Sequence, residues 1–471
     1  MTVVCKLVVG DIVMTTAERL FPFNQVPKGS RIILYGLGMV GKIYLSQISQ
    51  MQWCEIAYLM DRQAVQSEWD YDLLNMDDVS NVSPDLYDYV VIAISNLRTV
   101  HQVAKELIEK GIPQERIISS VSKQEEDDDV TDDSPLKVLL YMTGGVGDGV
   151  TDLAIYQRLV NLVPDIIIDI YGEPFINFLY KAKTNIRQIY DYHKVQKQPE
   201  GYDLVLQGSW WMSVQSCRMG RIKRLAPELA HLVRLTQQNM AKHEPIGLRV
   251  QQARILGKDK FWLMSHGGIW EFHPSMIQVD FDHDFAAEYR RLELKKYITI
   301  NCGADMRYVD SGCQPTKIWP KEHFEAFIII FKSYFPEYEV VQLGAANQER
   351  IAGADRNLLG QPFELVTYIL KNSTLHIDDE SGLVHLATAL GTKCIGLFGP
   401  TKPDVFGYKQ NVNIYTDVCP SCAYNTSRWN SRCLRGMKKP VCMYSITPEM
   451  VMEQVRMYLS CNEHVEEYAQ V

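Results

Sequence analysis

The segment from Leu375 to Gly391 holds the residues whose types and spacing point most directly to chemistry. It reads as a strand, an acidic turn, Ser381-Gly382 and then an apolar helix. At the start of that helix the backbone amides of Ser381, Gly382 and Leu383 would be free, and with the helix dipole they would form an anion site. His385 follows Ser381 by four residues, so both side chains would face the same ligand. The segment therefore predicts a phosphate-binding site.

Two further turns would lie at the ligand-binding edge of such a sheet. The next strand ends in Gly399-Pro400-Thr401, and doubly wound sheets bind ligands at the carboxyl ends of their strands. Much earlier, Lys137 to Tyr141 reads as a strand that leads into the glycine-rich turn Gly144 to Gly149, which contains Asp148. Asp148 could act there as a general base, or it could cap the following helix, which we expect to begin near Thr151.

The elements that must position these residues form three successive blocks. In each block strands alternate with helical stretches, which is typical of parallel, doubly wound sheets. An acidic run at 125–129, continued by Asp132 and Asp133, cannot pack and marks a solvated linker. We predict an α/β fold of three Rossmann-like doubly wound units, with domains at 1–124, 136–294 and 295–471 and a linker at 125–135.

The first block contains a dinucleotide-type fingerprint. A strand at 31–35 runs into Gly36-Leu37-Gly38-Met39-Val40-Gly41, and a second strand ends at Met60-Asp61. Gly36, Gly38 and Gly41 would let the backbone approach a pyrophosphate, and Asp61 would bind a ribose hydroxyl. The same glycines also suit an ordinary tight turn. The hypothesis of a second nucleotide site, for NAD(P) or a nucleotide sugar, therefore stands beside a purely structural interpretation.

The order of motifs in the last two blocks resembles the heptosyltransferase family, glycosyltransferase family nine. That family carries Asp-Ser/Thr-Gly-x-x-His and then Phe-Gly-Pro-Thr, and the matching positions here are Glu380 to His385 and Phe398 to Thr401. Its Lys-x-Trp-Pro is matched by Lys317 to Pro320, its Gly-x-x-x-Glu-Glu/Gln-Glu-Arg loosely by Gly344 to Arg350, and its Gly-Asp pair by Gly147-Asp148. The resemblance covers about residues 136 to 461.

The resemblance implies a two-domain GT-B glycosyltransferase that holds an NDP-sugar, typically ADP-heptose, in its cleft. It implies inversion at the anomeric carbon with Asp148 as the general base and without a catalytic metal. Lys317 and the helix amides at Ser381 would neutralise the leaving diphosphate, and Glu349 would bind the ribose. Glu380 departs from the family's usual Asp by one methylene, which leaves the sugar and the base of the donor open.

Four of the eleven cysteines gather in one segment at 419–442. Its C-x-x-C opening and its spacing suit a tetrahedral thiolate site for iron or zinc, and four thiolates leave no open position for catalysis. Such a segment ahead of the last helix also resembles the autotransporter heptosyltransferases, whose members carry iron there and assemble into rings. We therefore predict a structural metal site formed by the four cysteines, Cys419, Cys422, Cys433 and Cys442.

Plainer interpretations stand beside these assignments. Lys317 could be an ordinary solvated lysine, and His385 could be a core histidine. The pair Trp210-Trp211 could stack on an acceptor sugar or belong to the core. Two other functions also compete with sugar transfer: an NAD(P)-dependent oxidoreductase acting through the first domain, and a non-catalytic nucleotide-sugar-binding assembly protein, which the departure at Glu380 motivates.

Composition narrows the classes of partner. The net charge of −9, without a long run of Lys or Arg, argues against nucleic acid. The sequence lacks the ~20 consecutive apolar residues that span a bilayer, and it does not open with a signal-peptide pattern, so we expect a cytoplasmic enzyme. The acceptor stays open between a surface glycan, such as lipopolysaccharide core, and a protein hydroxyl. The resemblance also leaves a homo-oligomer open.

Overall fold

The computed structural model describes residues 21–23, 25–62, 71–94, 97–119, 132–195, 198–208, 211–240, 245–303, 309–311, 313 and 315–469. Most of the predicted linker, and Trp210, lie outside these residues. Contacts divide the chain into two units, Met1–Asp129 with Gln238–His243, and Val130–Gln237 with Glu244–Val471. The boundary that we predicted inside the second unit, between 294 and 295, stays a prediction.

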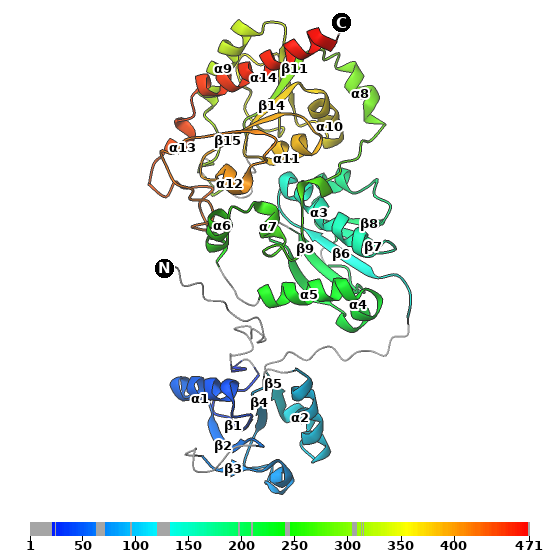
Figure 1. Ribbon diagram of the computed structural model, residues 1–471, viewed down its shortest axis with the longest axis vertical. Coiled ribbons are helices and arrows are strands. Elements are labelled where there is room, and N and C mark those ends of the chain that lie inside the picture. The colour runs from blue at the N-terminus through cyan, green and yellow to red at the C-terminus, as the bar shows by residue number, and fades with distance from the viewer. Residues whose placement is uncertain are drawn as a thin grey trace, which may run out of the picture. The chain divides into compact units, whose positions relative to one another are not determined.

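The first unit is one parallel sheet with a helix on each face. Its elements are β1 (Arg31–Tyr35), α1 (Met39–Met51), β2 (Glu55–Met60), β3 (Leu73–Leu74), β4 (Tyr89–Ile92), α2 (Leu97–Glu109) and β5 (Ile117–Ser119). The strand order is β3-β2-β1-β4-β5, and α1 and α2 flank the sheet from opposite sides (Figure 1). Successive side chains of β1 point to opposite faces, so Ile32 and Leu34 pack in the core under α1 while Ile33 and Tyr35 pack in the core under α2.

The second unit contains two sheets. We call the part built on the first of them the middle domain. Its elements are β6 (Lys137–Met142), α3 (Val146–Leu162), β7 (Ile167–Gly172), β8 (Ile186–Asp191), β9 (Leu204–Gly208), β10 (Ser213–Cys217), α4 (Met219–Leu225), α5 (Pro227–Met240), α6 (Ile246–Ile255) and α7 (Lys260–Met264). The strand order is β10-β9-β6-β7-β8, and only the edge pair formed by β10 and β9 is antiparallel within this sheet.

We call the part built on the second sheet the C-terminal domain. Its strands are β11 (Tyr297–Asn301), β12 (Glu339–Gly344), β13 (Arg356–Leu359), β14 (Leu375–Asp379), β15 (Cys394–Phe398) and β16 (Val412–Tyr415). Its helices are α8 (Phe285–Arg291), α9 (Lys321–Tyr334), α10 (Phe363–Asn372), α11 (Gly382–Ala389), α12 (Pro403–Phe406), α13 (Val441–Tyr444) and α14 (Pro448–Ala469). The six strands are parallel in the order β13-β12-β11-β14-β15-β16.

In all three sheets the first strand of the block lies at or next to the centre. The next strands are added on one side of it and the later strands on the other side. This order confirms the predicted α/β fold of three doubly wound units, and the two sheets of the second unit belong to the predicted GT-B pair of domains. One boundary differs from our expectation, because α3 begins at Val146 and not near Thr151. Asp148 therefore lies inside the first turn of a helix.

The two domains of the second unit contact each other at several places, of which two frame the sheets. Between the sheets, α3 of the middle domain lies against α11 of the C-terminal domain (Figure 1). At the other contact, Phe178 stacks on Phe363 with ring centroids 5.3 Å apart. Beside this stack, Lys181 donates to Glu364 at 2.9 Å and also pairs with Asp282. The second contact is therefore aromatic and ionic.

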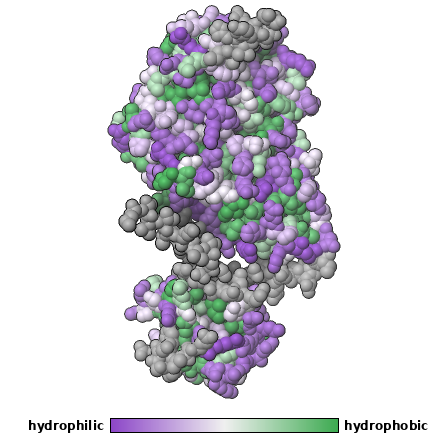
Figure 2. Space-filling model, in the orientation of Figure 1, coloured by the Kyte–Doolittle hydropathy of each residue, from purple (hydrophilic) through white to green (hydrophobic). Residues whose placement is uncertain are grey.

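The visible surface is mixed in character. Figure 2 shows hydrophilic residues over most of the face in view, with hydrophobic residues in small separate patches. In the part of the chain that the structure describes, none of the helices combines the length and the apolar character that a membrane span requires.

Candidate active site

The helices that start at the two predicted site turns meet end to end. A Cβ on Gly147, in the first turn of α3, would lie 2.6 Å from the Cδ2 atom of His385. A Cβ on Gly382, at the start of α11, would lie 2.3 Å from the Cγ1 atom of Val146. Only glycine permits so close an approach at either position. Two helix N-termini, each with a partial positive charge, therefore face one interface, and both favour an anion there.

Asp148 lies at this meeting point. Its Oδ2 atom accepts a hydrogen bond from the Gly145 amide at 2.8 Å, so the carboxylate caps α3 as one of our two interpretations expected. Burial raises the pKa of the carboxyl group, against the lowering effects of the Gly145 amide and of Lys317. A raised pKa makes a carboxylate a stronger base near neutral pH. The cap thus orients the Asp148 carboxylate, and its role as a base stays a prediction.

Lys317 and Glu380 form an ion pair next to Asp148. The Nζ atom of Lys317 donates to the backbone oxygen of Glu380 at 2.8 Å and to its Oε2 atom at 3.3 Å. The exposed fractions of these side chains are 23% and 12%, so Lys317 is not an ordinary solvated lysine. Thr401 completes the contact, because its hydroxyl donates to the Oε2 atom of Glu380 at 3.4 Å. Burial opposes the ionisation of Glu380, but Lys317, with smaller contributions from His385 and Lys260, holds its pKa at about 2.

The buried side chain of His385 forms a hydrogen bond with a second lysine. The Nδ1 atom of His385 accepts from Lys260 at 2.6 Å and lies 2.9 Å from the hydroxyl of Tyr408. Burial, with the charge of Lys260, lowers the pKa of His385 to about 4, so the ring is neutral and its proton is on Nε2. That nitrogen lies 3.7 Å from the Oε1 atom of Glu380. The histidine therefore belongs to one polar cluster with Glu380 and the two lysines, and it is not only a core residue.

Lys260 is a member of this cluster that sequence reasoning missed. It begins α7 in the middle domain, is 5% exposed, and its ammonium lies 3.9 Å from the ring centroid of Tyr408 in the C-terminal domain. Burial lowers the pKa of Lys260 to about 7, against the opposing charges of Glu380, Asp259 and Asp148. No motif surrounds Lys260, so only the folded chain shows that it reaches across the interface.

The start of α11 is held by a buried polar network. The Ser381 hydroxyl donates to Asp378 and accepts from the Leu383 amide at 3.2 Å. Asn301 donates to Asp378 at 2.9 Å and to the Ser381 hydroxyl at 3.2 Å. Ser381 is therefore the cap of α11, and the amide of Leu383 is satisfied by that cap, which differs from our prediction that it is free. The network fixes the helix end that faces the middle domain.

The Glu349 side chain makes none of the contacts described for the polar cluster and the start of α11. Its carboxylate pairs with Lys321 at 2.9 Å and its side chain is 81% exposed. The backbone oxygen of Glu349 accepts from the Gln342 side chain at 2.8 Å, which ties the backbone after β12 to this strand. Its predicted contact with a ribose stays a prediction.

The aromatic residue at 211 is engaged within the middle domain. The guanidinium carbon of Arg249 lies 3.7 Å from the ring centroid of Trp211, and the ring of His266 lies 4.2 Å from the same centroid. Both neighbours fix the indole. The use of this ring as a platform for an acceptor sugar stays a hypothesis, and its neighbour Trp210 lies outside the described residues.

The predicted second nucleotide site is a glycine turn in the first unit. Gly36 adopts a φ of +96°, and a Cβ on Gly41 would lie 1.9 Å from the Gly36 oxygen, so both glycines serve the turn itself. A Cβ on Gly38 would meet no described atom within 4 Å. The Oδ2 atom of Asp61 accepts from the Leu37 amide at 2.7 Å, which ties the end of β2 to this turn.

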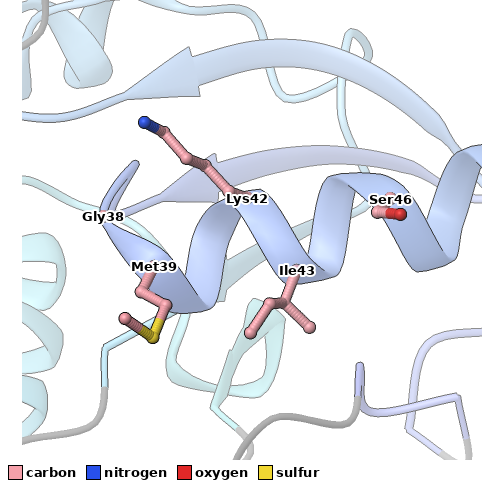
Figure 3. A pocket seen from close by; sticks show the side chains of 5 residues that line it. All are labelled: Gly38, Met39, Lys42, Ile43 and Ser46. Atoms are coloured by element: carbon pink, nitrogen blue, oxygen red, sulfur yellow. The ribbon is translucent and has the colours of Figure 1, made fainter.

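A cavity of about 490 Å³ opens beside Gly38 along α1. Figure 3 shows that Lys42 and Ser46 lie on one side of the helix, whereas Met39 and Ile43 point to the other. The turn therefore leaves open space at Gly38 with a lysine nearby.

The four clustered cysteines have free thiols. Burial raises the pKa of Cys422 to about 11, and the charges of Cys442, Cys419 and Cys433 add to the rise, so the four sulfurs lie near one another. A set of four thiols matches the ligands that iron and zinc prefer. Among the described residues no group of three or more His, Cys, Asp or Glu side chains has the arrangement that holds a metal ion, and the metal site at these cysteines stays a prediction.

Comparisons with known proteins match part of the chain to one family. The family model described as "Glycosyltransferase family 9 (heptosyltransferase)" matches residues 200–430. No curated protein sequence matches the chain significantly.

Several solved structures share low sequence identity with the chain. The E. coli ADP-heptose lipopolysaccharide heptosyltransferase II is 16% identical over 70% of this chain and 100% of its own, with a TM-score of 0.44. The iron-containing dodecameric glycosyltransferase TibC from enterotoxigenic E. coli is 15% identical over 70% of this chain and 78% of its own, with a TM-score of 0.47. The family 9 glycosyltransferase from Veillonella parvula is 13% identical over 69% of this chain and 97% of its own, with a TM-score of 0.43. Residues 200–430 therefore match glycosyltransferase family 9 (heptosyltransferase), and this match indicates that the chain is a glycosyltransferase.

Proposed function

We propose that the protein transfers a sugar, heptose from ADP-heptose in the first instance, to a hydroxyl acceptor with inversion at the anomeric carbon. The observation that carries the proposal is the meeting of Asp148 with the Lys317–Glu380 pair at the facing ends of α3 and α11. A base from one domain and a cationic, helix-terminal anion site from the other are the two parts that this displacement needs.

The proposed reaction uses the chain's own groups. Asp148 accepts the proton of the acceptor hydroxyl while the acceptor oxygen forms a bond to the anomeric carbon. The bond from that carbon to the diphosphate oxygen breaks, and the electron pair leaves with the diphosphate. Lys317, Lys260 and the N-terminus of α11 then balance the charge of the leaving group.

Glu380 pairs with Lys317, and its charge also acts on Lys260, until the donor arrives. Its ionised carboxylate interacts with both ammonium groups, and a bound diphosphate would compete with it for them. The family-typical Asp would be one methylene shorter. The longer side chain supports a donor pocket of somewhat different shape, so the donor should be identified by measurement.

Donor binding and transfer provide separate tests. Isothermal titration with ADP-, GDP-, UDP- and dTDP-sugars identifies the nucleotide, and Lys317→Ala should weaken binding of the true donor at least tenfold. Lys296→Ala is the matched control, since Lys296 is a 44% exposed lysine of the same domain that pairs with Glu337. Asp148→Asn should keep donor binding and lose transfer by about 10²-fold or more. Normal turnover by this variant would remove the assigned base.

The acceptor, the compartment and the assembly belong to the same proposal. We propose a hydroxyl of a surface glycan or of a protein as the acceptor, action in the cytoplasm and a homo-oligomeric state. The solved structure of TibC, an iron-containing dodecamer, supports testing the oligomer by light scattering. A monomer at micromolar concentration would contradict that part.

We also propose that Cys419, Cys422, Cys433 and Cys442 take up a structural iron or zinc ion. Four free thiols in one segment support this, and the ion would have no part in the transfer step. Elemental analysis of protein purified without chelators should find about one metal per chain. A Cys433→Ser variant should lose it. Wild-type protein that holds neither iron nor zinc after such a purification would refute the proposal.

A nucleotide site at Gly38 is a second, separate proposal. The open space at Gly38 and the cavity along α1 support it. A thermal-shift screen with nucleotide sugars and with NAD(H) should show binding that Gly38→Asp abolishes and Lys317→Ala leaves unchanged. Such a shift with NAD(H) alone would favour the oxidoreductase hypothesis.

A further inference from the structure

The Nδ1 atom of His385 has two hydrogen-bond donors within reach. The ammonium group of Lys260 lies 2.6 Å from this nitrogen, and the hydroxyl of Tyr408 lies 2.9 Å from it. In a neutral imidazole the nitrogen that carries no proton accepts through a single lone pair. Because this lone pair can serve only one donor fully, either Lys260 or Tyr408 can leave it without depriving His385 of a partner.

The two donors differ in how firmly they are held. Tyr408 is 4% exposed, its ring centroid lies 5.5 Å from that of His385, and its backbone oxygen accepts from the Asn413 side chain at 3.0 Å. All of these contacts lie within the C-terminal domain. Lys260 instead reaches in from the middle domain, and a lysine ammonium group sits on a flexible four-carbon stem. The tyrosine is therefore the fixed donor and the lysine is the adjustable one.

The groups that Lys260 touches here are neutral. Its ammonium group donates to the His385 ring and lies 3.9 Å from the ring centroid of Tyr408. A hydrogen bond between an ammonium group and a phosphate oxygen joins two opposite charges, so it is stronger than a bond to a neutral ring. A diphosphate bound at the start of α11, the helix that carries His385, would therefore draw the ammonium group away from the imidazole.

Departure of the lysine would leave a buried acceptor unsatisfied unless another donor replaced it. Removing one partner of a buried hydrogen bond costs the full desolvation of the group that remains. The Tyr408 hydroxyl is already close enough to bond Nδ1, so His385 would keep its proton on Nε2. Nε2 lies 3.4 Å from the position of a Cβ on Gly147, at the facing ends of α3 and α11. The proton on Nε2 is thus directed at the proposed diphosphate site.

We propose that Tyr408 is a positioning residue whose hydroxyl takes over the Nδ1 atom of His385 when Lys260 turns to the diphosphate of the donor. His385 then donates from Nε2 to the same diphosphate that Lys260 contacts. One exchange of partners thus gives the ligand two donors, one from each domain. The inference rests on the proposed function, and it assigns a role to a residue that touches no substrate.

A double-mutant cycle on Lys260 and Tyr408 tests this exchange, with ADP as the probe because it carries the diphosphate. Urea unfolding without ADP measures stability, and isothermal titration measures ADP affinity. In the wild-type background Tyr408→Phe, which removes only the hydroxyl, should weaken ADP binding about 3- to 30-fold. It should leave the urea midpoint unchanged, because Lys260 satisfies Nδ1 in the free protein.

The Lys260→Met background should reverse this pattern. Without the lysine, the Tyr408 hydroxyl is the donor to Nδ1 both in the free protein and in the ADP complex. Tyr408→Phe should then lower the urea midpoint and leave the remaining ADP affinity unchanged, because both states lose the same hydrogen bond. Tyr334→Phe, at a 54% exposed tyrosine of the C-terminal domain, is the control and should change neither quantity in either background.

The pattern across the cycle separates the possible roles of the hydroxyl. Equal weakening of ADP binding in both backgrounds would overturn the exchange, because the hydroxyl would then contact the nucleotide itself. A lower urea midpoint in both backgrounds with unchanged affinity would also overturn it, since the hydroxyl would then serve only the fold. Either result leaves the proposed donor standing. If the wild-type protein does not bind ADP, the proposed donor fails and this inference fails with it.

Discussion

Replacing Lys260 by Met should stabilise the protein and weaken its donor binding at the same time. The substitution removes a buried ammonium group but keeps an unbranched side chain of similar length. The pKa of Lys260 falls from 10.5 to about 7 in the folded chain, mainly because of burial. At ~1.4 kcal/mol per pKa unit, this difference corresponds to at most ~5 kcal/mol of lost stability where the group is charged in both states.

The sign of the pH dependence follows from the same difference. Below pH 7 the folded chain carries the full penalty, and between pH 7 and about 10.5 the penalty shrinks because the folded lysine is neutral while the unfolded one binds a proton. The stability gained in Lys260→Met should therefore be ~5 kcal/mol at most at pH 6 and ~3 kcal/mol at pH 8.5.

Urea unfolding at pH 6 and at pH 8.5, without donor, measures the two gains. Lys258→Met is the control, because Lys258 is exposed two residues earlier and its loss should change stability by less than about 0.5 kcal/mol. Donor affinity of Lys260→Met should fall at least tenfold. A gain of equal size at both pH values, or a loss of stability, would refute the argument that a charged Lys260 is held in place for the donor.

Three other predictions rest on buried groups. Stability should fall by ~3 kcal/mol between pH 6.5 and pH 4, because the depressed pKa of His385, about 4, makes protonation costly, and His385→Gln should flatten this part of a pH–stability curve. Asp152 is fully buried and both its oxygens lack a described partner, so burial raises its pKa well above the usual value. Asp152→Asn should therefore be more stable than wild type in thermal unfolding at pH 7, with a gain that disappears near pH 4. Phe363→Ala should lower the melting temperature by removing the ring that stacks on Phe178, and unchanged stability would show that this contact is weak.

The sheets were predictable because their strands are short apolar runs bounded by turn residues. The strands β1, β11 and β15 have the bounds that the residue pattern indicates. The start of α3 was not predictable, since three glycines in its first residues and at its cap disfavour a helix. The hydrogen bond from Gly145 to Asp148, visible only in the folded chain, starts the helix there.

Some residues of the candidate site could likewise be predicted from the sequence, and others could not. Lys317, Glu380 and Ser381 stand in motifs, so their closeness could be inferred from the order of the pieces. Lys260 and His385 are 125 residues apart and meet only because two domains pack together. Pattern reasoning has no access to such a contact, because the side chains that meet belong to no common element.

The contact between Gly147 and Gly382 sets how closely the two domains can approach. A Cβ at either position would overlap the side chain of His385 or of Val146, so the helix ends come together only because both residues are glycine. We expect an alanine at either position to act as a spacer that keeps the two halves of the site slightly too far apart for one substrate to reach both.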